Sequence, residues 1–258
     1  MKPHKTSNFP QTVERALDIL ESFINPNEGF GITELSHKVK LNKSTTYRII
    51  QALKAKDYIK QDVQSNKYYL GYKILKIANS FLNQNKLRAV ARKYLEELST
   101  ETLQTAQLAI LEGCEVVYID QVEGNDVFQL RFQIGNRGPL YCTAAGKSIL
   151  AFLKGNELEN VLDNLDLIPI TNKTVTSIEH LKKEIRTIKR NGFSFCDREY
   201  DKYIRAIGAP IIGLNQKVIG AVILTAPSNR MKLKEVPYYG NMTKEVALKI
   251  SLEMGGHI

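Results

Sequence analysis

The sequence contains no tryptophan, only three cysteines and no long uninterrupted apolar segment. Cys114, Cys142 and Cys196 are odd in number and far apart, so they do not indicate a disulfide framework. We interpret each as a small buried hydrophobic residue, suited to a reducing cytoplasm. No run of about 18 apolar residues could cross a membrane, and no apolar stretch follows residues 1–8 to make a secretory signal. These absences argue against a disulfide-rich secreted domain and an integral membrane protein.

Side chains arranged for catalysis or metal binding are also sparse. A nucleophilic Cys142 or Cys196 would need a distant base, and the sequence offers no convincing candidate. The histidines match neither zinc-ligand spacing nor a catalytic triad, because they are scattered at His4, His37, His180 and His257. We therefore expect no catalysis, no cofactor and no metal site. A small-molecule-processing enzyme remains the alternative interpretation.

What the sequence does contain is basic charge, and that charge is unevenly distributed. The 258 residues include 36 Lys and Arg against 27 Asp and Glu, a net charge of +9. Residues 38–60 hold seven of the basic side chains against Asp57 alone, whereas residues 86–258 carry a net charge of only +3. A basic cluster favours binding to nucleic-acid phosphates through counterion release. The alternative is a solvated face of a lysine-rich protein.

The basic cluster coincides with a helix-turn-helix pattern. Apolar residues at helical spacing predict a first helix over residues 12–24. Thr33 can cap a second helix, and Asn42 is a plausible N-cap for a third that runs to about Lys56. Two short strand-like segments around the polar turn at residues 62–66 predict a hairpin. A hairpin after the third helix makes the motif a winged helix, whose third helix can enter a DNA major groove.

The outward side of the predicted third helix and the hairpin supply candidate DNA contacts. Arg48 is the first choice for a base contact, since a guanidinium can pair bidentately with guanine. Contact with phosphate alone is the alternative for Arg48, and packing between helices is the alternative for Tyr47. A protein-binding winged helix is the alternative for the whole motif. The predicted DNA-binding residues are Lys43, Ser44, Thr45, Tyr47, Arg48, Gln51 and Lys67.

The rest of the chain reads as α+β with a largely antiparallel sheet. We expect a winged helix-turn-helix domain over residues 9–71, a linker helix and connection over 72–85, and a second domain over 86–258. Strand-like segments at residues 105–111, 116–122 and 128–134 precede a series of helices, and further strands precede a last helix near residues 234–254.

Two motifs in the second domain could hold a ligand. A strand-like segment runs into a helix opened by Thr143 and small residues, and helix N-terminal N–H groups attract anions. A carboxylate-bearing metabolite would suit that position, although tight helix packing is the alternative. Further on, Asp197 could accept a hydrogen bond from a ligand hydroxyl, or could belong to a surface ion-pair cluster with Arg198.

These motifs together resemble the IclR-type bacterial transcriptional regulators over nearly the whole chain. The N-terminal resemblance lies in residues 14–20, in Lys43-Ser44-Thr45-Thr46-Tyr47-Arg48 and in Lys67-Tyr68-Tyr69-Leu70-Gly71. The C-terminal resemblance lies in residues 142–151, Gly192-Phe193-Ser194, Asp197-Arg198-Glu199 and residues 206–210. Two separate signatures in the right order make the resemblance specific.

The resemblance implies a winged-helix domain followed by a GAF-like effector-binding domain. It implies homodimers, often paired into homotetramers, that bind palindromic operators in double-stranded DNA. Members repress or activate catabolic genes in response to small, often carboxylate metabolites, and we expect a repressor. The family's effector positions, carried over to this chain, are Ala144, Ala145, Asp197, Ala206, Ile223 and Thr225.

This chain departs from the family pattern near the implied pocket. Tyr203 stands where the family usually has glycine, and a tyrosine does not easily adopt a positive φ. We therefore expect a different loop there, with Tyr203 as a candidate cover for the pocket. Ala206 and Ile223 replace residues that are often Cys or Ser, so the pocket is expected to be more apolar. No His/Cys set matches the metal site of some relatives.

Overall fold

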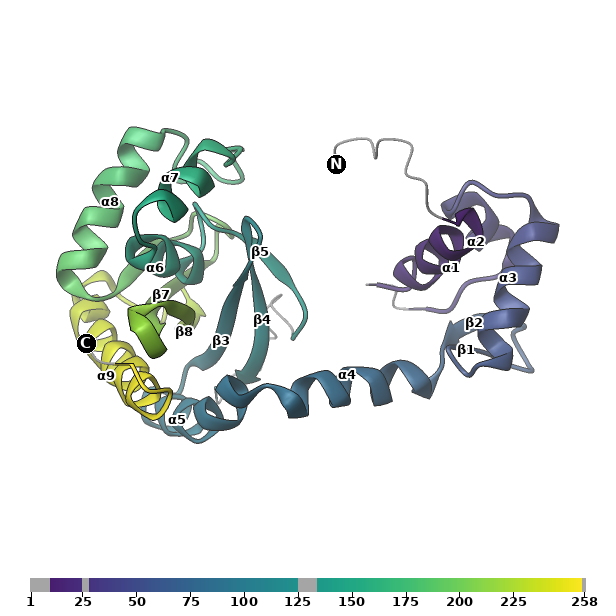
Figure 1. Ribbon diagram of the computed structural model, residues 1–258, viewed down its shortest axis with the longest axis horizontal. Helices are drawn as coiled ribbons and strands as arrows, with labels where there is room; N and C mark the ends of the chain where they lie inside the picture. Colours follow the sequence, from purple (N-terminus) through teal and green to yellow (C-terminus); the bar gives the residue numbers. More distant parts are fainter. Residues whose placement is uncertain (1–9, 25–27, 125–133, 257–258) are drawn as a thin grey trace. The chain divides into compact units, whose positions relative to one another are not determined.

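The N-terminal unit of the computed structural model, Met1–Gln84, carries helices, a hairpin after them and a further helix after the hairpin (Figure 1). Of the whole chain, the structure describes residues 10–24, 28–124 and 134–256. The elements of this unit are α1 (Gln11–Glu21), α2 (Ile32–Lys38), α3 (Lys43–Ala55), β1 (Ile59–Gln61), β2 (Tyr68–Leu70) and α4 (Tyr72–Gln84). The predicted helix-turn-helix and wing are confirmed.

An apolar core holds the helices of this unit against the hairpin. Ile19 of α1, Leu35 of α2 and Ile50 of α3 are completely buried, and Ile59 and Tyr68 close the core from the hairpin. Each is the inward member of its helix or strand, so the hydrophobic periodicity of the sequence accounts for the packing.

The N-cap predicted for the second helix is wrong. Helix α2 begins at Ile32 with Gly31 as its N-cap, and Thr33 lies inside the first turn. The Gly31 N–H donates to Glu34 Oε2 at 2.7 Å. Glycine is a tolerable N-cap, and the Glu34 carboxylate satisfies the backbone donor that would otherwise lack a partner. The Glu34 side chain, three residues after Gly31, therefore determines that α2 begins at Ile32.

The second unit, Asn85–Ile258, is built on a six-stranded sheet of order β5-β4-β3-β8-β7-β6 in which neighbouring strands are antiparallel. The predicted α+β class is confirmed. The strands are β3 (Thr105–Glu112), β4 (Glu115–Val122), β5 (Arg137–Pro139), β6 (Ser194–Asp197), β7 (Ile204–Ile212) and β8 (Val218–Pro227). The helices are α5 (Lys86–Thr102), α6 (Ala144–Phe152), α7 (Asn156–Asp163), α8 (Ile178–Asn191), α9 (Val236–Glu253) and the 3-10 turns η1 (Leu214–Gln216) and η2 (Leu233–Glu235).

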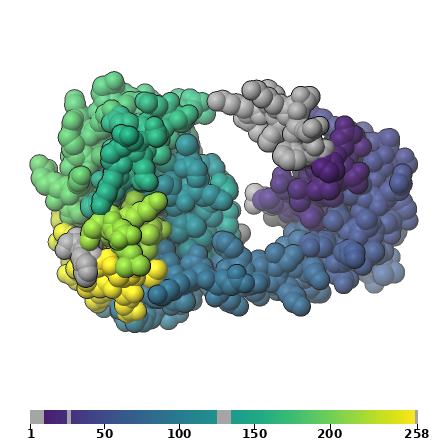
Figure 2. Space-filling view, viewed as in Figure 1, coloured from purple at the N-terminus to yellow at the C-terminus, as the bar shows by residue number. Residues whose placement is uncertain are grey.

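Helices cover both faces of this sheet (Figure 1). Helices α5 and α9 pack on one face against residues such as Leu108 and Val222, and α6 and α8 pack on the other against Ala109 and Ile223. Neighbouring strand residues thus face opposite layers, as the pleat requires. Helices α8 (green) and α9 (yellow) form part of the outer surface in Figure 2.

Two glycines let helix α6 pack closely against its neighbours. A Cβ on Gly146 would lie 2.4 Å from the backbone of Leu140, in the segment between β5 and α6, and a Cβ on Gly208 of β7 would lie 2.5 Å from the Ala144 carbonyl oxygen. Any side chain at either position would therefore push α6 away. The close approach places the first residues of α6 directly on β7, where the candidate cavity lies.

Several smaller expectations differ from the structure or fall outside it. Strand β5 was not predicted, because three residues are too few for a periodic signal. Most of the strand expected at residues 128–134 lies outside the described residues.

Cys142 and Cys196 are buried as expected, but Cys114 is exposed in the turn between β3 and β4, so its interpretation as a buried residue was wrong. Among the described residues, no helix is long and apolar enough to cross a bilayer.

Candidate nucleic-acid interface and ligand cavity

Helix α3 presents a polar outer face because its inner face is committed to the core. Asn42 caps the helix as predicted, its side chain accepting from Thr45 N at 2.8 Å. Thr46, Ile49 and Ile50 are buried. The residues between them are thereby turned outward. We call this exposed face of α3 the reading surface, and it consists of Lys43, Ser44, Tyr47 and Arg48.

The predicted DNA contacts differ in how exposed they are to solvent and in whether they already have a partner. Tyr47 is 51% exposed, which removes the alternative that it packs between helices. Thr45 and Gln51 are half-buried. Lys67, immediately before β2, pairs with Glu28 at 2.8 Å. Since both groups of that pair are close to solvent, screening keeps the pair weak, and Lys67 can exchange it for a phosphate.

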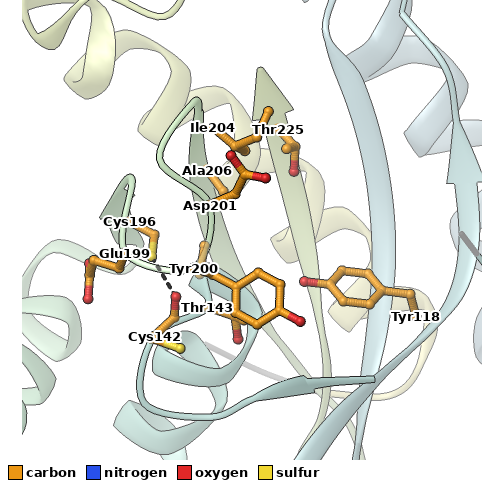
Figure 3. Close-up of a pocket in the computed structure, with 11 residues that line it drawn as sticks. Tyr118, Cys142, Thr143, Cys196, Glu199, Tyr200, Asp201, Ile204, Ala206 and Thr225 are labelled. Atoms are coloured by element: carbon orange, nitrogen blue, oxygen red, sulfur yellow. Dashed lines mark hydrogen bonds between the residues drawn. The ribbon is translucent and has the colours of Figure 1, made fainter. Parts of the chain in front are cut away.

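A small, partly open cavity of about 20 Å³ lies beside the N-terminus of α6 (Figure 3). Its wall combines the start of α6, the middle of β4, the loop between β6 and β7, and the strands β7 and β8. The lining residues are Tyr118, Cys142, Thr143, Ala144, Cys196, Glu199, Tyr200, Asp201, Ile204, Ala206 and Thr225. Two tyrosines, two cysteines and two acidic residues are therefore among the residues of its wall, and none of the described lining residues is a lysine or arginine.

The cavity contains three of the six effector positions that the family resemblance implied. Ala144, Ala206 and Thr225 line it, and a ligand role for them stays a prediction. The remaining three, Ala145, Asp197 and Ile223, are not among its lining residues.

Tyr200, rather than Tyr203, is the aromatic side chain that the β6–β7 loop contributes to the cavity. Tyr203 is 63% exposed and is not a lining residue. Arg198, with φ of 64°, is the loop residue in the left-handed region. Figure 3 shows Tyr118 and Tyr200 extending into the cavity from opposite walls. Sequence reasoning missed both tyrosines, although Tyr118 lies in a strand whose alternation could have indicated an inward side chain.

Lys147 is completely buried one turn into α6, on the side of the cavity wall. Its Nζ lies 2.5 Å from Glu199 Oε2 and 2.6 Å from Glu184 Oε2. Burial would lower the pKa of Lys147, but its acidic neighbours Cys196, Glu199 and Glu184 outweigh burial and raise it. Burial raises the pKa of Glu199, with Lys147 opposing. The lysine charge is therefore used to hold the loop onto α6 and is not free for a ligand.

The cavity thiols are poor nucleophiles. Burial raises the pKa of the Cys142 thiol to about 12 and raises that of Cys196 well above its ordinary value. The Cys196 Sγ–H also donates to the Cys142 carbonyl oxygen at 2.9 Å. Since the thiolate is the reactive form, this environment disfavours the enzyme alternative.

Asp197 is the centre of a surface ion-pair cluster, which is the alternative that the sequence left open. It accepts hydrogen bonds from Lys173, from Arg198 Nε at 3.0 Å and from Arg205 Nε at 2.7 Å. Burial would raise its pKa, but the hydrogen bonds from Lys173, Arg205 and Arg198 hold the pKa of Asp197 well below its usual range. The cluster ties the start of β7 to the end of β6.

This cluster predicts a pH-dependent part of the stability. A carboxyl whose folded pKa is depressed stabilises the protein above its unfolded pKa of 3.8, and the contribution is lost as pH falls toward the folded value. We expect Asp197→Asn to be less stable at pH 7 and to lose less further stability than the wild type below about pH 4. Urea unfolding between pH 7 and 3 measures this. Asp163→Asn, at an exposed position of α7, is the control, and parallel pH curves for wild type and Asp197→Asn would contradict the prediction.

Comparison with known proteins matches both units of the chain. Residues 79–252 match the family model described as the bacterial transcriptional regulator IclR C-terminal domain, and residues 12–63 match the IclR helix-turn-helix domain. The chain is 31% identical to the HTH-type transcriptional regulator KdgR of Escherichia coli, with 98% of this chain and 96% of that protein covered. It is 27% identical to the transcriptional repressor IclR of Escherichia coli, with 95% and 90% covered.

A solved structure gives the same result. The crystal structure of IclR from Thermotoga maritima is similar to this fold with a TM-score of 0.84 at 28% identity, and the alignment covers 95% of this chain and 99% of that one. The similarity therefore extends over both units.

Proposed function

Because the chain belongs to the IclR family of bacterial DNA-binding transcriptional regulators, we propose that it is a repressor released from its operator by a small metabolite. The metabolite is a carboxylate-bearing compound of a catabolic pathway, and it occupies the cavity beside α6. The observation that carries the proposal is the pairing of a solvent-facing α3 with a partly open, mostly apolar cavity in the other unit.

The N-terminus of α6 supports a carboxylate as the ligand group. Thr143 and Ala144 open this nine-residue helix and both line the cavity. Thr143 Oγ1 already accepts from Gly146 N at 3.1 Å, so the first-turn N–H groups before Gly146 remain for a ligand oxygen. The positive end of a helix dipole stabilises an anion. Because no described lining residue carries a positive charge, this helix end is the feature of the wall that suits an acid.

The proposal is tested by coupling ligand binding to DNA binding. An operator duplex is first selected from a random pool with the full chain, and affinity is measured at several salt concentrations, where it should fall steeply as salt rises. Sugar acids, aromatic acids and keto acids are then screened by thermal shift. An acid that stabilises the protein should weaken binding of the selected duplex at least about tenfold, that is, by about 1.4 kcal/mol.

A cavity variant gives the matched control. Ala206→Phe should abolish the thermal shift and the acid's effect on DNA while duplex affinity is kept, because the ring fills the cavity in the unit that does not carry α3. Ala89→Phe, at an exposed position of α5, should retain both responses. An acid response that persists in Ala206→Phe, or duplex binding that ignores salt, would contradict the proposal.

We also propose that the repressor is a homodimer whose two reading surfaces recognise the halves of a palindromic operator. The support is the apolar surface of the N-terminal unit. Helix α4 has no buried residue, yet Tyr72, Leu75, Ile77 and Phe81 on it are 48–78% exposed. Exposed apolar residues concentrated on one helix suit a partner, and a second copy supplies the symmetry that palindromes require.

A charged residue on α4 should break this dimer. We expect Leu75→Glu to shift the protein from dimer to monomer in sedimentation at micromolar concentration, because the carboxylate would be desolvated at the interface. Lys76→Glu, the adjacent exposed residue, controls for charge alone. A wild-type chain that sediments as a monomer, or a Leu75→Glu chain that stays dimeric, would refute this arrangement.

A further inference from the structure

A chain of buried side-chain hydrogen bonds leaves the cavity wall and crosses three neighbouring strands. Thr225 of β8 lines the cavity, and its hydroxyl donates to Gln107 Oε1 of β3 at 2.9 Å. Gln107 Nε2 then donates to Gln121 Oε1 of β4 at 2.8 Å. Thr225 and Gln107 are 2% and 1% exposed. Because β8, β3 and β4 are adjacent in the sheet, the chain runs straight from the cavity to β4.

The far end of this chain is attached to helix α5. The Gln121 N–H donates to Asp120 Oδ1 at 3.0 Å, and the Gln121 carbonyl oxygen accepts from an Arg92 guanidinium nitrogen at 3.2 Å. Arg92 also pairs with Asp120 at 3.1 Å, and Arg88 does so at 3.4 Å. Asp120 is completely buried, so these arginines cannot leave it without a large desolvation cost. A displacement of Gln121 would therefore also displace Arg92 and, through it, helix α5.

An irregularity in β4 gives the cavity a second connection to the same ion pair. Tyr118 pairs with Ala109 and Asp120 pairs with Leu108, so Ile119 is an extra residue in the strand. Val116 and Tyr118 face the cavity layer by ordinary alternation, and the bulge then places Asp120 against α5 in the opposite layer. Bulges re-aim side chains in this way. The cavity and the α5 clamp are thus two residues apart on one strand.

The hydrogen-bond chain has a direction, and the direction can reverse. As found, each donor points away from the cavity, from Thr225 to Gln107 to Gln121. A ligand oxygen that takes the Thr225 proton would leave Gln107 Oε1 buried without a donor, which costs about 1–3 kcal/mol. Turning over both amides would restore every bond with the opposite polarity. A ligand that accepts from Thr225 therefore binds the two polarities with different affinity, as a population shift requires.

We propose that Thr225, Gln107 and Gln121 form a polar relay that reports occupancy of the cavity to helix α5 through the Asp120–Arg92 pair. Gln107 is the positioning residue of this relay, since it touches neither the cavity nor α5. The proposal rests on the proposed effector function of the cavity. It adds the route by which that cavity acts on α5, the helix that follows α4 after the single residue Asn85.

The relay is tested by hydrogen exchange on the full chain, with neither DNA nor ligand present. Gln107→Met keeps the volume and removes the polar atoms. We expect it to raise amide exchange at least about threefold in peptides from α5 as well as from β3 and β4. Gln104→Met is the matched control, because Gln104 is also buried but its Oε1 lacks a hydrogen-bond partner among the described residues. It should leave α5 unchanged. Faster exchange confined to β3 and β4 would overturn the proposal and indicate a local structural role.

A double-mutant cycle tests the two ends directly and does not depend on Gln107→Met folding. In peptides from α5, the change in amide exchange rate of the Thr225→Val/Arg92→Lys double variant should differ by more than about threefold from the product of the changes in the two single variants. Ser194→Ala removes a buried hydroxyl of β6 that donates to the Ala144 carbonyl oxygen and is not part of the relay. It should be additive with Arg92→Lys within about twofold. Additivity of Thr225→Val with Arg92→Lys would refute the relay. Because no duplex or effector enters this measurement, its failure is distinct from failure of the repressor proposal.

Discussion

Lys147→Met is expected to destabilise the second unit by about 3–5 kcal/mol, the cost of breaking a buried ion pair and leaving its partner charged. The Lys147 side chain is 1% exposed, and its Nζ is held between Glu184 and Glu199. Removing the ammonium leaves the Glu199 carboxylate, itself 8% exposed, without its counter-charge. Urea unfolding followed by circular dichroism measures the loss, since the sequence has no tryptophan to report it by fluorescence.

A second variant separates the missing charge from lost packing. Lys147→Met combined with Glu199→Met should recover a large part of the lost stability, because replacing a whole buried pair by apolar side chains is often neutral. Lys154→Met, at an exposed position just after α6, should change stability by less than about 0.5 kcal/mol. If the double variant is as unstable as the sum of its parts, the ion pair is not the reason for the effect.

Arg48→Ala is expected to weaken operator binding by about 1–3 kcal/mol for each half-site, or about 5- to 150-fold, if the guanidinium reads a guanine. Arg48 is exposed on the reading surface, one turn into a helix whose other face is locked in the core. The helix should stay folded, because the removed side chain makes no contribution to that core. Fluorescence anisotropy with the selected duplex measures the change.

The form of the loss distinguishes base contact from phosphate contact. A base contact predicts that Arg48→Ala no longer discriminates the selected duplex from one with a single substituted pair. A phosphate contact predicts uniform weakening and a salt slope lower by about one. Arg186→Ala, an exposed arginine of α8, controls for net charge. Unchanged affinity in Arg48→Ala would refute the assignment of α3 as the reading helix.

The nucleic-acid interface could be predicted from the sequence because its determinants are local. Asn42 caps α3 by accepting a hydrogen bond from the N–H of Thr45, three residues further along the chain. The spacing of Thr46, Ile49 and Ile50 decides which side of the helix is buried. The outward side then follows from geometry. Only the details were open, and the structure decided those: Tyr47 is exposed, and Lys67 is paired with Glu28.

The cavity could be predicted only in part, because its wall combines segments that are distant in the sequence. Ala144 was found from a local motif, since a helix N-terminus with small residues is visible in the sequence. Tyr200 was missed because its position depends on a loop conformation, and Tyr118 was missed although the alternation of its strand indicates an inward side chain. Asp197 was open between two interpretations, and three basic partners from separate segments decided for the ion-pair cluster.

By itself the sequence determined the winged helix, the α+β class and the family, since each follows from short-range periodicity, capping and motif order. Tertiary structure alone decided which partners the charged and polar side chains of the second unit pair with. Lys147 is buried against Glu199, 52 residues away in the sequence. Gln107 and Thr225 are 118 residues apart and meet only because β3 and β8 are paired. Burial raises the free-energy cost of leaving a polar group without a hydrogen bond several-fold. Burial depends on how the whole sheet and its helices pack, so no local segment of the sequence determines it.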